Sequence, residues 1–154
     1  MRNYILPLIS TLALAACQSS DTATEAVPAA VVVGFDQEFS LYYRQQAKLP
    51  VTNSAELTVS VAELQYSFCP PNARCFVADF VAPTLSITDQ RGQTQQVKMP
   101  VSQARTRAAN WIDTTSVRAN NRRYVLYYHR YIVAENVTQP QKKDLSVVLR
   151  ITKP

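Results

Sequence analysis

The feature that most constrains the fold is a two-residue apolar alternation that recurs along the chain. It is clearest in LSVVLRIT (residues 145–152), where every second residue is a large aliphatic one. This is the period of a β-strand with one buried face. No stretch after residue 17 shows a sustained helical period, although residues 102–109 are compatible with one or two helical turns. The sequence therefore predicts an all-β domain.

Turn-forming residues divide this pattern into short strands. The apolar phase shifts near Ala62 and Glu63, which predicts a β-bulge, and the turn DQRG (residues 89–92) predicts a hairpin. Residues 31–33 form a possible additional edge strand. About seven strands of this length and spacing are typical of an antiparallel β-sandwich, Ig-like or similar, with a small barrel as the alternative. The predicted strands are residues 39–49, 57–68, 81–89, 93–99, 111–117, 122–134 and 145–152.

The segment RRYVLYYHRYIVA (residues 122–134) holds half of the eight tyrosines and the single histidine. Both of its faces carry apolar bulk, which predicts a central strand. The face without Arg130 is expected to be the core side, with His129 buried between two tyrosines. A general base at His129 is an alternative, but it needs a nucleophile and an orienting acid, and no motif supplies them. A glycan-binding aromatic face is a second alternative. The expected core face consists of Val125, Tyr127, His129, Tyr131 and Val133.

The chain begins with a basic residue, Arg2, followed by an apolar run over residues 4–16. This run is shorter than the ~20 residues that span a bilayer, and it fits the hydrophobic part of a signal peptide. Its end, LAAC (residues 14–17), resembles the lipobox of bacterial lipoproteins at each position. The resemblance implies acylation, including palmitate, at Cys17, whereas an ordinary signal peptide that contains a cysteine is the alternative. By resemblance to the sorting signals of Gram-negative lipoproteins, Gln18 in place of aspartate implies an outer-membrane lipoprotein that faces the periplasm.

Three regions follow from this interpretation. Residues 1–16 are the expected signal peptide, and residues 17–34 are the lipidated N-terminus and a flexible tether that begins polar and small. Residues 35–154 are the expected β-sandwich, a length that suits one domain.

Cys69 and Cys75 flank a five-residue loop led by two prolines. Because the periplasm is oxidising, two thiols this close in sequence are expected to pair. A redox-active pair normally has the Cys-x-x-Cys spacing. A structural zinc normally takes four ligands, which two cysteines and one histidine do not supply. A structural disulfide is therefore predicted, with no metal.

Composition excludes several functional classes, and the distribution of charge leaves two interpretations open. Only two glycines occur, so neither a dinucleotide fingerprint nor a P-loop can be built. Residues 18–90 carry three basic and eight acidic side chains, whereas residues 91–154 carry twelve basic and three acidic ones. This asymmetry suggests an anionic partner surface, although the averaging of these charges in space by interleaved strands is the preferred interpretation. The candidate binding residues are Arg105, Arg107, Arg118, Arg122 and Arg123.

The motif around the two cysteines resembles one in a group of small bacterial secreted proteins and lipoproteins. Those sequences carry a D-S-R-C-P-x(4)-C-x-W-A-G-type stretch, and this chain matches it at Ser67, Cys69, Pro70, Cys75 and Ala78. The similarity extends over roughly residues 35–153. It implies a disulfide-containing β-sandwich without a known activity.

The chain departs from that motif at four positions: Tyr66 and Phe68 replace its charged pair, Asp and Arg, whereas Val77 replaces its Trp and Asp79 its Gly. A function carried by the charged pair is therefore expected to be absent here. From all these features we expect a non-enzymatic, lipid-anchored envelope protein that acts as an interaction or structural module and needs no cofactor. The alternative is a domain that binds an anionic glycan, lipid head group or acidic protein, but not nucleic acid, through an arginine-rich rim.

Overall fold

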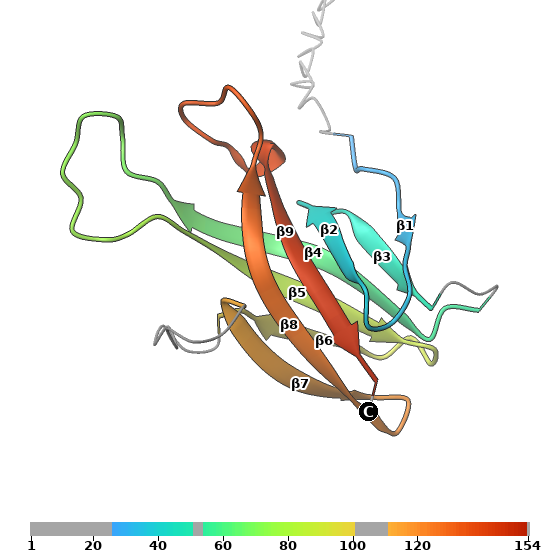
Figure 1. Cartoon of the computed structure of the whole chain (residues 1–154). Coiled ribbons are helices and arrows are strands. Elements are labelled where there is room, and N and C mark those ends of the chain that lie inside the picture. The colour runs from blue at the N-terminus through green and yellow to red at the C-terminus, as the bar shows by residue number, and fades with distance from the viewer. Residues whose placement is uncertain (1–25, 51–53, 101–110, 154) are drawn as a thin grey trace, which may run out of the picture.

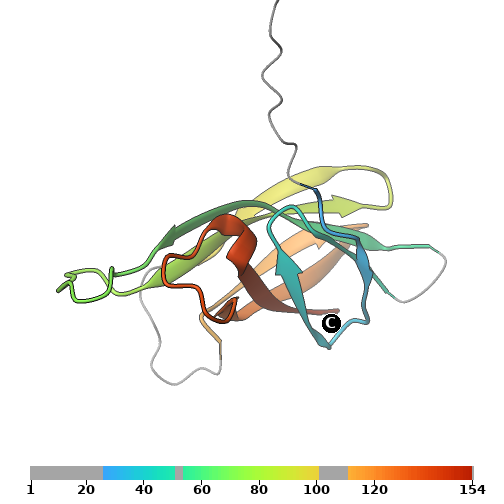
Figure 2. The ribbon, with the colours of Figure 1, turned by 90° about the horizontal axis from the view of Figure 1, so that it is seen from above.

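The computed structural model describes residues 26–50, 54–100 and 111–153. Over these ranges the chain forms the predicted antiparallel β-sandwich, with nine strands and one short 3₁₀ helix. Viewed from above, β4–β6 lie in one layer and β7–β9 in the other (Figure 1, Figure 2). The elements are β1 (Val31–Val32), β2 (Glu38–Tyr42), β3 (Gln46–Leu49), β4 (Leu57–Ser67), β5 (Phe80–Asp89), β6 (Thr94–Lys98), β7 (Asp113–Ala119), β8 (Arg122–Val133), η1 (Lys142–Asp144) and β9 (Leu145–Thr152).

One sheet has the strand order β1-β3-β4-β5-β6, and the other has the order β2-β9-β8-β7. All pairings are antiparallel except that of β1 with β3, which is parallel. The strand at residues 31–32 precedes Phe35, the expected start of the domain, and joins the edge of the five-stranded sheet. Among the described residues, none belongs to a helix long and apolar enough to cross a membrane.

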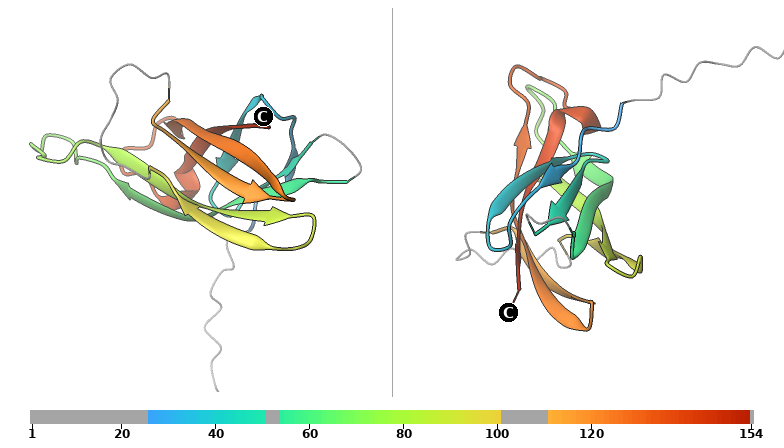
Figure 3. Two further views of the ribbon diagram at one scale, coloured as in Figure 1. Left: turned by 90° about the horizontal axis from the view of Figure 1, so that it is seen from below. Right: turned by 90° about the vertical axis from the view of Figure 1, so that its right-hand side faces the viewer.

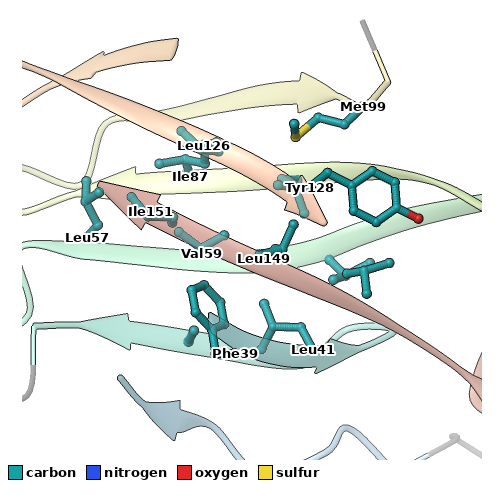
Figure 4. Packing of buried hydrophobic residues seen from close by; sticks show 14 of the residues in the cluster. Phe39, Leu41, Leu57, Val59, Ile87, Met99, Leu126, Tyr128, Leu149 and Ile151 are labelled. Atoms are coloured by element: carbon teal, nitrogen blue, oxygen red, sulfur yellow. The ribbon is translucent and has the colours of Figure 1, made fainter. Parts of the chain in front are cut away.

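The core lies between the two sheets, and the predicted alternation supplies it. Leu57, Val59 and Val61 of β4 are buried and meet the buried aliphatic residues of β9. Figure 4 shows Leu57 and Val59 beside Leu149 and Ile151 of the other layer, and it also shows Phe39 and Tyr128. The hydroxyl group of Tyr128 donates a hydrogen bond to the carbonyl oxygen of Val81, 2.8 Å away. A buried phenol therefore links the two sheets and leaves no unsatisfied polar atom at its tip.

The predicted bulge in β4 is confirmed. Val61 pairs with Leu85 and Glu63 pairs with Thr84, so Ala62 is the extra residue. Because a bulge places two successive residues opposite one, Leu64 returns to the buried face and continues the core.

The prediction of a single strand over residues 39–49 is wrong in one respect. The structure divides it into β2 and β3, which belong to different sheets. The chain turns at Arg44, whose φ of 62° lies in the left-handed region. The side-chain oxygen of Gln45 accepts the backbone N–H of Tyr42 at 3.0 Å, which holds this turn together.

The core face predicted for β8 is also wrong for the first half of the strand. Tyr124, Leu126 and Tyr128 are buried there, whereas Tyr127 lies on the outer face. A second bulge explains the difference: Tyr128 pairs with Leu149 and Arg130 with Val148, so His129 is the extra residue. Beyond the bulge, the partly buried Tyr131 packs against the core as predicted.

Candidate functional site

Two tight turns from different sheets meet at one end of the sandwich, and several predicted binding residues gather there. Residues 90–93 form the turn between β5 and β6, and Asn120 and Asn121 form the turn between β7 and β8. Together they enclose a hollow of about 460 Å³, here called the basic hollow. Its lining comprises Asp89, Arg91, Gln93, Arg118, Ala119, Asn120, Asn121, Arg122 and Arg123.

The local sequence explains the β7–β8 turn. Asn120 and Asn121 have φ angles of 49° and 60°, which match a two-residue hairpin turn with both central residues in the left-handed region. Asparagine tolerates this conformation better than most residues. The hairpin register that follows pairs Ala119 with Arg122 and Arg118 with Arg123.

The β5–β6 turn is built around a buried carboxylate. Oδ1 of Asp89 accepts the backbone N–H groups of Arg91 and Gln93, each at 2.9 Å, and the side chain of Asp89 is only 3% exposed. Burial opposes the ionisation of Asp89, but the N–H groups of Gln93, Arg91 and Asn120 outweigh it and hold the pKa of Asp89 below its ordinary value. Asp89 is thus ionised at neutral pH and shapes the turn.

Side-chain amides join the two turns. The backbone N–H of Gln90 donates to Oδ1 of Asn120 at 3.2 Å, and Nη2 of Arg91 donates to Oδ1 of Asn121 at 3.0 Å. Nε2 of Gln95 in β6 donates to the backbone oxygen of Arg118 at 2.9 Å. The two edge strands β6 and β7 are thereby held side by side at this end.

Glu56 supports the same end from the start of β4. Its backbone oxygen accepts Nδ2 of Asn120 at 2.8 Å, and its carboxylate accepts hydrogen bonds from Tyr124 and from Nζ of Lys153, the latter at 2.7 Å. Burial raises the pKa of Glu56, but the hydrogen bonds from Lys153 and Tyr124 more than offset this, so its pKa is lowered overall. Glu56 is therefore a fixed anion that holds the asparagine turn.

The basic hollow carries a clear excess of positive charge. Four arginines line it, and its one acidic side chain, Asp89, is bonded to the turn backbone and lies 4.0 Å from Nε of Arg91. Arg118 and Arg123 are direct cross-strand partners, and both are exposed. Like charges in directly opposite positions destabilise a strand pair. Within the described ranges, no carboxylate lies within 4.0 Å of the basic groups of Arg118, Arg122 or Arg123. The arrangement is therefore suited to an anion.

The structure brings together three of the five predicted arginines. Arg118, Arg122 and Arg123 line the basic hollow, whereas Arg105 and Arg107 lie outside the described residues, as does Cys17. Arg91 is a fourth lining arginine that the sequence does not predict, because residues 89–92 indicate only a turn. Two turns thirty residues apart show no local sign that they meet, so only the strand order reveals this neighbour.

Cys69 and Cys75 form the predicted disulfide, with their Cα atoms 5.9 Å apart. It closes the loop between β4 and β5 at the end of the sandwich away from the basic hollow (Figure 1). In the described ranges, no cluster of three or more histidine, cysteine or acidic side chains could hold a metal ion.

His129 lies at the β8 bulge with its side chain 7% exposed, and its Nδ1 is 3.5 Å from Oε1 of Glu38. Glu38 also pairs with Arg130 at 3.1 Å, so the carboxylate is shared by two basic groups. Tyr124 and Tyr128 are fully buried, so they do not belong to an aromatic binding face. Tyr127 is on the outer surface, edge to face with Trp111 and covered by the guanidinium of Arg150.

Comparison of the chain with models of known families, with curated proteins and with solved structures finds no match. What the structure itself defines is a disulfide-containing antiparallel β-sandwich with a basic hollow at one end.

Proposed function

We propose that the protein is a non-enzymatic interaction module of the bacterial envelope that binds an anionic component through the basic hollow. The observation that carries this proposal is the directly opposed pair Arg118 and Arg123 beside Arg91 and Arg122. Such a grouping is unfavourable for the isolated strand pair and becomes favourable when an anion lies between the guanidinium groups. The planar, five-donor guanidinium suits carboxylate and phosphate groups.

The lipid anchor is the second part of the proposal. It is supported by the lipobox-like residues 14–17 behind a complete signal-peptide pattern. Cys17 would hold the domain at the outer membrane, on the periplasmic side, and the tether would give it local freedom. A component that carries carboxylate or phosphate groups, such as an acidic protein, a glycan or a lipid head group, would then be within reach.

Retention on an anionic polymer tests the binding proposal. Protein is applied to immobilised polyglutamate and to immobilised lipopolysaccharide, with neutral dextran as the blank, and is eluted with salt. We expect retention on an anionic matrix that weakens with salt, because exposed charges are screened beyond ~8 Å at physiological ionic strength. Replacing Arg91, Arg118, Arg122 and Arg123 with serine should abolish it.

A matched variant separates a specific site from general basicity. Lys48, Arg74, Lys98 and Lys143 are exposed and lie outside the basic hollow. Their replacement with serine removes the same charge and should leave most of the retention. Equal loss in both fourfold variants would contradict the proposal. A double variant, Arg105→Ser with Arg107→Ser, tests the two predicted residues that lie outside the described ranges.

A further inference from the structure

The tip of the β4–β5 hairpin presents large apolar side chains to solvent. Phe76 is 108% exposed and Val77 is 63% exposed relative to an extended chain, and Phe80 at the base of the tip is 36% exposed. These values contrast with the polar surface of the basic hollow. We call Phe76 and Val77 the apolar tip. Single exposed apolar side chains are ordinary surface, but Phe76 and Val77 also line a groove whose other residues are largely apolar, and a contiguous apolar surface of this kind is typical of a contact site.

The apolar tip is held in shape by covalent and hydrogen bonds. The disulfide between Cys69 and Cys75 closes the loop immediately before Phe76. The backbone N–H of Cys69 donates to Oδ1 of Asp79 at 2.8 Å, across the base of the loop. A loop closed in this way cannot collapse easily onto the sandwich, so the exposure of Phe76 is a built feature of the hairpin. Preordering also lowers the entropy that a contact would otherwise cost.

The apolar surface continues from the tip towards the body of the sandwich. A groove of about 610 Å³ runs along the start of β5, where its lining includes Phe76, Phe80, Val81 and Tyr131. Arg74 is exposed beside the tip, whereas the Asp79 carboxylate is bonded to the backbone of Cys69. One basic residue next to an aromatic and an aliphatic side chain is a combination that suits a membrane interface.

The position of the tip relative to the N-terminus identifies the occupant. The tip, the β8–β9 connection and the first described residues all lie at the upper side of the molecule in Figure 1, and the side view in Figure 3 agrees. The β7–β8 turn lies at the lower side in both views. Nine peptide steps separate Cys17 from Ala26, which at full extension span roughly 30 Å. An anchor at Cys17 therefore keeps the bilayer within roughly 30 Å of this upper side, the side that carries the tip.

We propose that the apolar tip inserts into the membrane interface and forms a second, reversible contact beside the lipid anchor. The inference rests on the proposed anchor for the proximity of the bilayer. A protruding tip fits a deformable lipid phase directly, whereas a protein partner would have to offer a fitted pocket. Burial of each of these side chains favours the inserted state roughly ten- to a hundredfold. The domain would then stand with its basic hollow facing away from the lipid, which leaves an acidic protein or a glycan, and not a head group of the same bilayer, as the ligand of the hollow.

Fluorescence quenching in vesicles tests this orientation. Full-length lipidated protein is reconstituted into phosphatidylethanolamine–phosphatidylglycerol vesicles as Phe76→Trp and, for comparison, as Gln90→Trp at the opposite end. Both positions are exposed, so neither substitution disturbs the core. The wild-type protein, whose single tryptophan is Trp111, gives the background emission to be subtracted. With brominated lipids, the emission from position 76 should be blue-shifted and at least halved, whereas that from position 90 should be unchanged.

Three results would overturn the proposal or separate it from the anchor. Equal emission from positions 76 and 90 in vesicles overturns it. A blue shift at position 76 that needs added membrane proteins, and is missing in pure lipid, also overturns it and assigns the tip to a protein. If the full chain does not float with vesicles, the anchor proposal fails. A histidine tag in place of residues 1–17, bound to nickel-lipid vesicles, then repeats the comparison and decides on the tip alone.

Discussion

The backbone N–H of Gln90 donates a hydrogen bond to the side-chain oxygen of Asn120, 3.2 Å away. Gln90 follows β5 in one sheet and Asn120 follows β7 in the other, so this bond fastens the two layers at their ends. Nδ2 of the same asparagine donates to the backbone oxygen of Glu56 at 2.8 Å. One amide therefore fixes the relative position of three chain segments around the basic hollow.

Replacing Asn120 should destabilise the domain in two separable ways. Asn120→Ala removes both side-chain hydrogen bonds and places alanine at a φ of 49°, and we expect a loss of about 2–3 kcal/mol in the free energy of unfolding. Asn120→Gly loses the bonds without the backbone strain and should cost about 1–2 kcal/mol. Urea unfolding measures both. Alanine and glycine variants of equal stability would show that strain at this residue plays no part.

Asp89 should make the stability of the domain sensitive to acid. The pKa of Asp89 is lowered in the folded protein. Its carboxylate therefore stabilises the fold fully at a pH above about 3.9, the pKa of aspartate in an unfolded chain. This stabilisation is lost as the pH falls through the lower pKa that Asp89 has in the folded protein. Thermal unfolding between pH 6 and pH 2 should therefore show a smaller acid-induced decrease for Asp89→Asn than for wild type. Identical pH profiles for Asp89→Asn and wild type would contradict the prediction.

The disulfide should matter for the tip and not for the basic hollow. Mass analysis of the exported protein without reductant should find Cys69 and Cys75 linked, with two mass units missing. Replacing both with serine should lower the free energy of unfolding by at most roughly 2–3 kcal/mol, as expected for a short closed loop. Retention on an anionic matrix should persist, because the loop lies at the other end of the molecule. Readily labelled thiols in the oxidised protein would speak against the pairing.

Cys17→Ser tests the proposed anchor. The thiol is the expected acceptor of the lipid, so its loss should block processing and leave precursor or mis-sorted protein. Cell fractionation and the mass of the N-terminal peptide measure this. If the variant is processed and retained in washed membranes as wild type is, an ordinary signal peptide is the better interpretation.

Local sequence patterns predict most of the strands, because the apolar alternation of a strand relates residues only two positions apart. The alternation in β4, β5 and β9 and the phase shift at Ala62 all appear in the structure. The turn at Arg44 is not predicted by the sequence, because apolar and polar residues alternate both before and after it within residues 39–49. Its left-handed φ, in a residue that seldom adopts it, is set by the packing of β2 and β3 on different sheets.

The candidate site was only half predictable for a related reason. Arg118, Arg122 and Arg123 are close in sequence, and their proximity follows from one hairpin. Arg91 lies beside them because two turns thirty residues apart are in contact, and its hydrogen bond to Asn121 joins the two turns. The apolar tip was not predicted because Phe76 and Val77 lie between two predicted strands, where an apolar residue type alone does not tell whether the side chain is buried or exposed. Only their exposure in the folded chain distinguishes them.

The bulge at His129 has a consequence for how the length of this chain can vary over evolution. Tyr128 and Arg130 pair with the adjacent residues Leu149 and Val148, so a chain without His129 would keep every other rung of that ladder. Deleting a residue such as Leu126 would instead move each following side chain of β8 to the opposite face. Homologues one residue shorter in this strand are therefore expected to carry the gap at this position, with the tyrosine core intact.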